Sequence, residues 1–129
     1  MHPFIRSVAI VAFALSAAHA TAKEPDACGA LPDYVREAAR DMAYCITMPA
    51  PIAACGKTAV DVQVFDNAEG RLSKAGSGQT YYEGKARQNP GGAAGTYRLV
   101  FLVTDGKTKS VIDNRYYSAD HYASFCSIR

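Results

Sequence analysis

The stretch "YRLVFLV", residues 97–103, is the most apolar candidate strand in the chain, and its place among its neighbours decides the fold class. Directly after it, "TDGK" at residues 104–107 contains the Asp-Gly pair typical of a β-hairpin turn. "SVIDNRYY", residues 110–117, follows as a second run of β-forming residues. The pattern predicts that these two runs pair as antiparallel strands.

Further strand-like runs lie on either side of this hairpin. Valines alternate with polar residues over 60–64, and "QTYYEGKA" at 79–86 is again rich in β formers. The last run is "HYASFCSI", residues 121–128. Turn-forming segments separate the runs, namely "FDNAEG" at 65–70, "KAGSG" at 74–78 and "NPGGAAG" at 89–95. We therefore expect a meander of about five antiparallel strands.

The segment before these strands has a helical pattern. Its apolar residues recur at helical spacing: Leu31, Val35, Ala38, Ala39, Met42 and Ile46. Pro32 suits the first helical turn, and Asp33 and Glu37 lie near the positive end of the helix dipole. The following "TMPAPIAACGK", 47–57, holds two prolines and a glycine and predicts a loop. The fold class is α+β, with one N-terminal amphipathic helix packed on one face of the sheet.

The first twenty residues, "MHPFIRSVAIVAFALSAAHA", have the pattern of a secretory signal peptide. A basic Arg6 leads into a short apolar run, and the segment ends in the A-x-A pattern of a cleavage site after Ala20. The apolar run is too short to span a bilayer. We expect residues 1–20 to be removed, leaving residues 21–129 as a single exported domain with no membrane association.

Four cysteines remain after the leader. An even number in a small exported domain favours two disulfides over a metal site, and one remaining histidine is too few for the usual zinc patterns. Four cysteines allow three pairings. We favour Cys28–Cys126, which ties the start of the domain to its last strand, with Cys45–Cys55 closing a local loop.

Charge excludes one class of function. The formal net charge of the chain is only +2 at pH 7. A broad electrostatic grip on duplex nucleic acid is therefore not indicated, and any anion site must be local.

Three residues in the candidate strands are able to do chemistry. Glu83 lies within the run 79–86, Arg98 begins the most apolar strand, and His121 begins the last strand. Taken singly, each has an ordinary structural reading: a solvent-facing carboxylate, a strand-end cation and a space-filling imidazole. Together, on neighbouring strands of one sheet, they are suited to acid–base chemistry on a phosphodiester.

Four ordered segments resemble the motif set of the microbial guanyl-specific ribonucleases, the family of barnase. They are "FDNAEGRL" at 65–72, "YYEGKA" at 81–86, "YRLVF" at 97–101 and "DHYASF" at 120–125. The resemblance covers about residues 60–129. It implies the microbial ribonuclease fold and a secreted endoribonuclease that cleaves single-stranded RNA 3′ of guanosine, without a metal or another cofactor.

The resemblance also implies a role for each residue of the reacting trio. Glu83 would be the general base that takes the proton of the 2′-hydroxyl, which attacks its own phosphorus to give a 2′,3′-cyclic phosphate. His121 would be the general acid for the departing 5′-oxygen, and Arg98 would hold the non-bridging oxygens. The roles of base and acid would reverse when water opens the cyclic ester.

Base recognition is implied for the turn after the first strand. Glu69 would accept the N1 and N2 hydrogens of guanine, and backbone amides around Asn67 and Ala68 would donate to O6. Phe65 would add main-chain contacts, and Asn67 would hold the turn through a left-handed conformation. Tyr122 would stack on the base. Solvated-turn and sheet-packing roles remain the alternatives for Glu69 and Tyr122.

The chain departs from the family pattern in four ways, one of which is a hairpin between Arg98 and His121 that is several residues longer. Ala68 and Ala94 stand where bacterial members usually carry arginines, and the helical part has no clear counterpart of a lysine that barnase supplies. Lys85 and Arg87 are candidates to replace some of that charge.

These departures keep other functions open. One is a catalytically weakened or inactive ribonuclease-fold protein that binds nucleotide or a protein partner, and another is an unrelated disulfide-stabilised exported domain. By analogy with the family we expect a monomer, extracellular or periplasmic, with a possible small barstar-like inhibitor protein as its partner.

Overall fold

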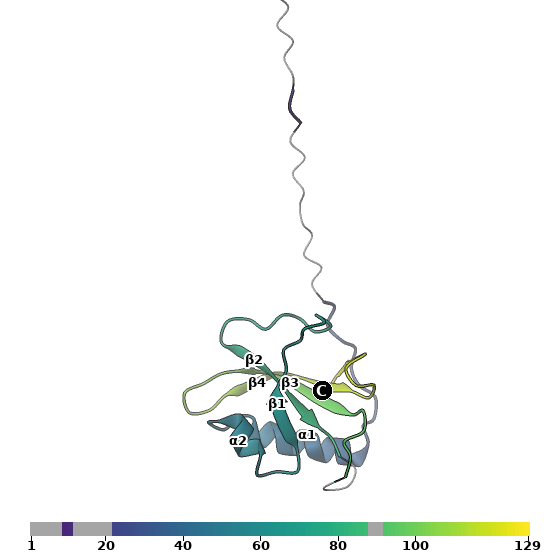
Figure 1. Ribbon diagram of the computed structural model, residues 1–129, viewed down its shortest axis with the longest axis vertical. Helices are drawn as coiled ribbons and strands as arrows, with labels where there is room; N and C mark the ends of the chain where they lie inside the picture. Colours follow the sequence, from purple (N-terminus) through teal and green to yellow (C-terminus); the bar gives the residue numbers. More distant parts are fainter. Residues whose placement is uncertain (1–8, 12–21, 88–91) are drawn as a thin grey trace, which may run out of the picture.

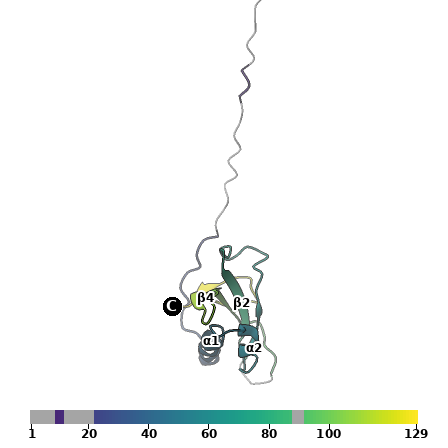
Figure 2. The ribbon, with the colours of Figure 1, turned by 90° about the vertical axis from the view of Figure 1, so that its left-hand side faces the viewer.

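The computed structural model describes residues 9–11, 22–87 and 92–129. It contains two helices, which lie on the same side of a five-stranded sheet (Figures 1 and 2). Most of the predicted leader (1–8 and 12–20) and residues 89–91 of the predicted 89–95 connection lie outside the described residues. Within the described ranges, no helix is long and apolar enough to cross a membrane.

Helix α1, Asp33–Cys45, confirms the predicted amphipathic helix. Its buried residues follow helical spacing and pack against the sheet: Val35, Ala38, Met42 and Cys45. The helix begins directly after Pro32, whose carbonyl oxygen accepts the amides of Val35 and Arg36. Proline suits this position because an amide N–H at the start of a helix would have no intrahelical acceptor.

The segment 47–57 was expected to be a loop, and that expectation is wrong in its second half. A short helix α2, Pro51–Cys55, begins with proline in its first turn and follows Ala50, which has a left-handed φ of 52°. Its last residue forms the Cys45–Cys55 disulfide, which fixes α2 against the end of α1. Proline does not break this helix, because the one proline within it, Pro51, occupies the first turn, where no intrahelical amide donor is needed.

The sheet is an antiparallel meander in the order β1-β2-β3-β4-β5, as predicted. The strands are β1 (Asp61–Val64), β2 (Gln79–Lys85), β3 (Arg98–Thr104), β4 (Val111–Ser118) and β5 (Cys126–Ser127). The hairpin between β3 and β4 is confirmed, but its loop spans residues 105–110 instead of a tight two-residue turn. Asp105 explains part of this, because its amide donates to the carbonyl of Gly78 in the neighbouring loop.

Both faces of the sheet are covered over β3. The helical side holds the larger core, and the opposite side holds a second cluster of Leu72, Tyr81, Val100, Leu102 and Tyr116. Residues 98–103 are all buried, which explains why this strand is a continuous apolar run. The sequence pattern predicted a helix on one face of the sheet and gave no sign of the second cluster on the opposite face.

Two strand predictions need correction. The run 121–128 forms a strand only at Cys126–Ser127, because residues 118–124 fold into a tight turn in which His121 and Tyr122 have positive φ. Val64 was expected to be buried in alternation with Val60 and Val62, yet it is 56 % exposed. It ends β1, where the chain turns away.

Both favoured disulfides are present, Cys28–Cys126 and Cys45–Cys55. The first brings the N-terminal segment beside β5, where Cys28 N donates to Ser127 O and Ser127 N donates to Asp26 O. The start and end of the domain are therefore joined by hydrogen bonds as well as by a covalent bond.

Candidate active site

The candidate site lies on the sheet face opposite the helices, and strand alternation places its first residue there. On β2, Gly84 faces α1, since a Cβ atom at this position would lie 2.7 Å from the sulfur of Met42. Its neighbours Glu83 and Lys85 therefore face the other side. The tight approach of Met42 explains the glycine in "YYEGK".

The strand register brings Glu83, the predicted general base, and Arg98 to adjacent strands. Lys85 on β2 lies opposite Arg98 on β3, and Glu83 lies opposite Val100. Glu83 and Arg98 are thus diagonal neighbours on one face, a separation that long side chains can span. The structure brings these two predicted residues together.

Arg98 is buried, which is unusual for an arginine. It is only 6 % exposed, and its Nη1 donates to Gly95 O at 3.0 Å and to Tyr97 O at 2.9 Å. Its Nε is buried without a hydrogen-bond partner among the described residues. A buried donor normally has an acceptor, so this edge of the guanidinium is suited to receive an oxyanion ligand.

His121 lies in the turn between β4 and β5, not on a strand. Ser118 Oγ donates to Asp120 Oδ1 and accepts the Tyr122 amide, each at 2.9 Å. Asp120 also accepts the amide and hydroxyl of Ser124. These bonds, first those from Ser124 and then that from Ser118, lower the pKa of Asp120. They support a turn with two consecutive left-handed residues, His121 and Tyr122, at φ of 52° and 73°.

Thr96 ties this turn to the start of β3. Its carbonyl accepts the His121 amide at 3.0 Å, and its hydroxyl donates to Ala119 O at 2.6 Å. Because Thr96 is two residues before Arg98, the exposed imidazole of His121 and the buried guanidinium are held at the same end of the sheet.

Tyr122 connects Glu83 and Arg98 to the loop after β1. Its ring stacks on Phe65 with centroids 5.4 Å apart and an interplanar angle of 20°, and Arg98 Cζ lies 5.8 Å from its centroid. Burial, and then hydrogen bonding to the Glu83 carboxylate, raise the pKa of Tyr122 to about 12, while Arg98 opposes this shift. The phenol is therefore a protonated donor at neutral pH, beside both Glu83 and Arg98.

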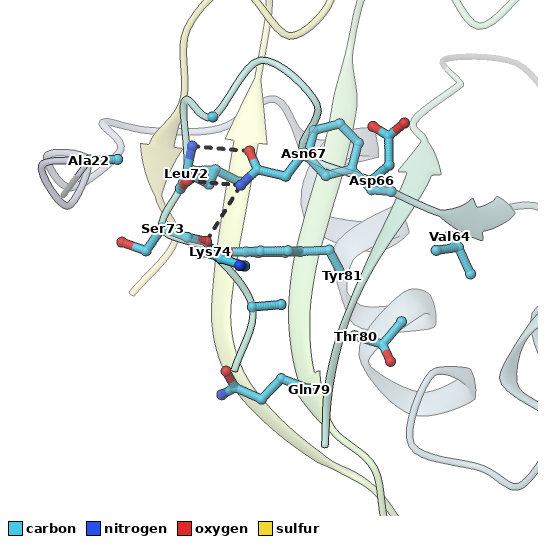
Figure 3. Close-up of a pocket in the computed structure, with 13 residues that line it drawn as sticks. Ala22, Val64, Asp66, Asn67, Leu72, Ser73, Lys74, Gln79, Thr80 and Tyr81 are labelled. Atoms are coloured by element: carbon cyan, nitrogen blue, oxygen red, sulfur yellow. Dashed lines mark hydrogen bonds between the residues drawn. The ribbon is translucent and has the colours of Figure 1, made fainter. Parts of the chain in front are cut away.

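The loop 65–71, which we call the recognition loop, is fixed by Asn67. Its side-chain nitrogen donates to Leu72 O at 2.8 Å, and its side-chain oxygen accepts the Leu72 amide at 3.2 Å (Figure 3). The predicted left-handed conformation is confirmed, with φ of 54°. One asparagine thus closes the loop at both donor and acceptor.

The amides of the recognition loop are not equally available to a ligand. Ala68 N donates to Asp66 Oδ1 at 3.1 Å, and Phe65 N donates to Tyr81 O. The amides of Asn67 and Glu69 have no protein acceptor among the described residues. The open donors are therefore the amides on either side of Ala68, which belong to the stretch around Asn67 and Ala68 that is predicted to donate to O6.

A pocket of about 110 Å³ lies between the recognition loop and the C-terminal turn. It is lined by all the predicted base-contact residues and by three further ones, Asp66, Arg71 and Phe125. Arg71 Nη2 lies 2.8 Å from Glu69 Oε2, and Phe125 packs edge-on against Phe65. Sequence reasoning missed them, although a cation two residues after Glu69 and an aromatic three residues after Tyr122 were visible signals.

The ranges that the structure describes contain no cluster of three or more histidine, cysteine, aspartate or glutamate side chains able to hold a metal ion.

Comparison with known proteins agrees with the motifs. A comparison with curated protein sequences gave no match. A family model described as ribonuclease matches residues 11–129, nearly the whole chain. This confirms the resemblance inferred from the four motifs and makes RNA the substrate class. The chain belongs to the ribonuclease family.

Proposed function

We propose that this protein is a secreted endoribonuclease that cleaves single-stranded RNA 3′ of guanosine by way of a 2′,3′-cyclic phosphate. The observation that carries the proposal is the buried Arg98 guanidinium, whose Nε has no acceptor among the described residues. It lies diagonally from Glu83 on one sheet face, at the end of the sheet that holds the His121 turn. A scissile phosphate is an acceptor of suitable charge and shape for that edge.

In the first step Glu83 takes the proton of the 2′-hydroxyl, whose oxygen bonds to phosphorus. The bond to the 5′-oxygen breaks, and His121 as imidazolium donates a proton to that oxygen. In the second step water attacks the cyclic phosphate, neutral His121 takes its proton, and Glu83 returns a proton to the 2′-oxygen. Histidine suits both states near neutral pH because its ordinary pKa is about 6.5.

Arg98 stabilises the charge that grows on the non-bridging oxygens. Its Nη1 is occupied by two backbone carbonyls, so the guanidinium is held in place before substrate arrives. Preorganised donors of this kind act more strongly in a partly buried site than in water. The Tyr122 ring lies against the guanidinium, with its centroid 5.8 Å from Arg98 Cζ.

Guanine is proposed to enter the pocket of the recognition loop. Glu69 accepts from N1 and N2, a pairing that adenine lacks, and the open amides of Asn67 and Glu69 are the donors for O6. Tyr122 and Phe125 provide the aromatic walls. One face of Tyr122 already stacks on Phe65, so its contribution to the base depends on the ring edge or on the remaining face.

Location and partners follow from the same assignment. Two disulfides and the predicted leader support export to an extracellular or periplasmic compartment. We propose a monomer that acts on single-stranded RNA, and a small inhibitor protein as a further partner in the producing cell.

The test uses residues 21–129 and an RNA that contains a single guanosine, without divalent metal. We expect one cut, with a 2′,3′-cyclic phosphate on the guanosine, identified by mass spectrometry. Intact RNA at high protein concentration would reject the enzyme and favour a nucleotide-binding relative. Cleavage after every base would reject only the guanine preference.

Arg71 is expected to set the strength of the guanine preference, because its ion pair orients the Glu69 carboxylate. Arg71→Ala should lower the kcat/KM ratio of GpA over ApA by about twofold to fivefold, the range of an exposed ion pair. Glu69→Gln should lower it by about 10²-fold, since a bidentate pairing is lost. Arg36→Ala is the matched control, because Arg36 pairs with Asp33 on the far side of the sheet. An unchanged ratio in Glu69→Gln would contradict the recognition scheme.

Asp120 is expected to act as a positioning residue for His121. Asp120→Ala removes the acceptor of three hydrogen bonds and should lower kcat by about tenfold, whereas Asp120→Asn keeps a carbonyl oxygen and should recover most of it. The lowered pKa gives a second readout: the stabilisation is full well above the ordinary value of 3.8 and is lost as pH falls through the folded-state pKa. As the pH is lowered below 4, the free energy of unfolding measured in urea should therefore fall more in the wild type than in Asp120→Asn. Equal kcat in Asp120→Ala and wild type would refute this role.

A further inference from the structure

A second, larger hollow of about 830 Å³ lies beside the recognition loop (Figure 3). The recognition loop forms one side, and residues 72–75 with the start of β2 form the other. Its volume is within the range of about 300–1,000 Å³ typical of ligand sites. Nothing in the proposed chemistry uses it.

The two pockets share a wall. Both pockets are lined by Phe65, Asp66 and Asn67. The two pockets therefore lie on opposite sides of one stretch of backbone. The Asn67 side chain pins that stretch to Leu72. The larger hollow is therefore formed before substrate binds and adjoins the base pocket directly.

Its position relative to the reacting groups sets the direction of the RNA. In the described part of the chain, Glu83, Arg98 and His121 do not line the hollow. The phosphate 3′ of the bound guanosine lies at those three residues, so the chain continues there toward the 3′ side. A nucleotide in the hollow beyond the recognition loop must then precede the guanosine.

The charge of the hollow suits a phosphodiester. Lys74 is exposed and forms no ion pair with any residue in the described ranges. The one carboxylate among the described lining residues, Asp66, accepts the Ala68 amide with Oδ1 and so is oriented into the loop. Exposed Val64 adds an apolar surface beside Phe65.

Most of the polar side chains around the hollow are already hydrogen-bonded within the protein. Gln79 accepts from Gly76 N and donates to Asp113, and the Tyr81 hydroxyl donates to Ser73 O. Both groups of the Asn67 amide are occupied as well. Few groups remain to read a base edge, so a base there is accommodated without selection.

We propose that this hollow is a subsite for the nucleotide 5′ of the recognised guanosine, in which Lys74 pairs with the connecting phosphate and the base is not selected. The inference rests on the proposed cleavage 3′ of guanosine. It predicts that 5′-extended substrates bind better than those that begin with guanosine.

The test compares GpA with UpGpA and ApGpA, all cleaved at the same bond, by kcat/KM at low ionic strength. Wild type should cleave both trinucleotides about threefold to tenfold better than GpA, the range of one charge-assisted contact near the surface. Lys74→Ala should remove that advantage and leave GpA unchanged. Added salt should reduce the advantage in wild type only.

Lys57→Ala, which removes the same charge just after α2 on the helical side, is the matched control and should keep the advantage. Equal kcat/KM for GpA and the trinucleotides in wild type would overturn the subsite and leave the proposed function standing. A loss for GpA as large as for UpGpA in Lys74→Ala would overturn it too. No cleavage of any of these substrates would overturn the proposed function and the subsite together.

Discussion

His121→Ala is expected to lower kcat/KM for cleavage after guanosine by about 10²–10⁴-fold, the usual contribution of a positioned general acid. The variant should fold normally, because the imidazole is exposed and the bonds that build its turn come from Ser118, Asp120 and Thr96. Initial rates on a single-guanosine RNA measure the loss.

A change of leaving group separates acid catalysis from a structural effect. Replacement of the 5′-nucleoside by p-nitrophenol gives a group that departs without protonation. His121→Ala should cleave this substrate within about tenfold of wild type, since only the proton donor is missing. An equal loss on both substrates would show that His121 acts on binding or folding and not as the acid.

The strand framework was predictable because its signals are local. The run 97–103 is apolar at every position but one, and the structure buries residues 98–103 on both faces of the sheet. The many β formers in 79–86 and the apolar spacing in α1 are similarly direct. Glu83 and Arg98 followed from these strands, since a meander places consecutive strands side by side.

The position of His121 could not be obtained in the same way. "HYASFCSI" has a strand-like composition, yet the hydrogen bonds of Asp120 compete with strand pairing and impose left-handed residues. Such bonds depend on side-chain orientation, which periodicity does not report. Serine and aspartate in "SADHYAS" were the available signal for a turn.

Long-range contacts were also beyond pattern reasoning. Tyr116 donates to Glu24 across 92 residues, and Phe125 reaches Phe65 from the opposite end of the domain. The second core arises from such contacts, because loops, not helices, cover that face. Five of the residues that line the 110 Å³ pocket were predicted as a set, but its aromatic wall at Phe125 was not.

Arg98→Lys is the second substitution with a large expected effect, because it keeps the charge and removes the planar fork. The single ammonium group cannot hold Gly95 O and Tyr97 O while also presenting two donors to a phosphate. We expect kcat to fall by about 10²–10³-fold, the effect of losing one preorganised oxyanion donor. The KM should change less, since the base pocket is untouched.

The same substitution has a separate cost in stability, which distinguishes the two roles of this arginine. Loss of the two part-buried hydrogen bonds to Gly95 O and Tyr97 O should lower the free energy of unfolding by about 1–3 kcal/mol, measured by urea denaturation. Arg115→Lys is the matched control: Arg115 Cζ lies 5.8 Å from the Phe101 ring, the distance of Arg98 from Tyr122, but outside the site. Its activity should stay within about twofold of wild type. If Arg98→Lys were destabilised yet fully active, the unpaired Nε of Arg98 would be a structural feature only, and the phosphate would have to bind elsewhere.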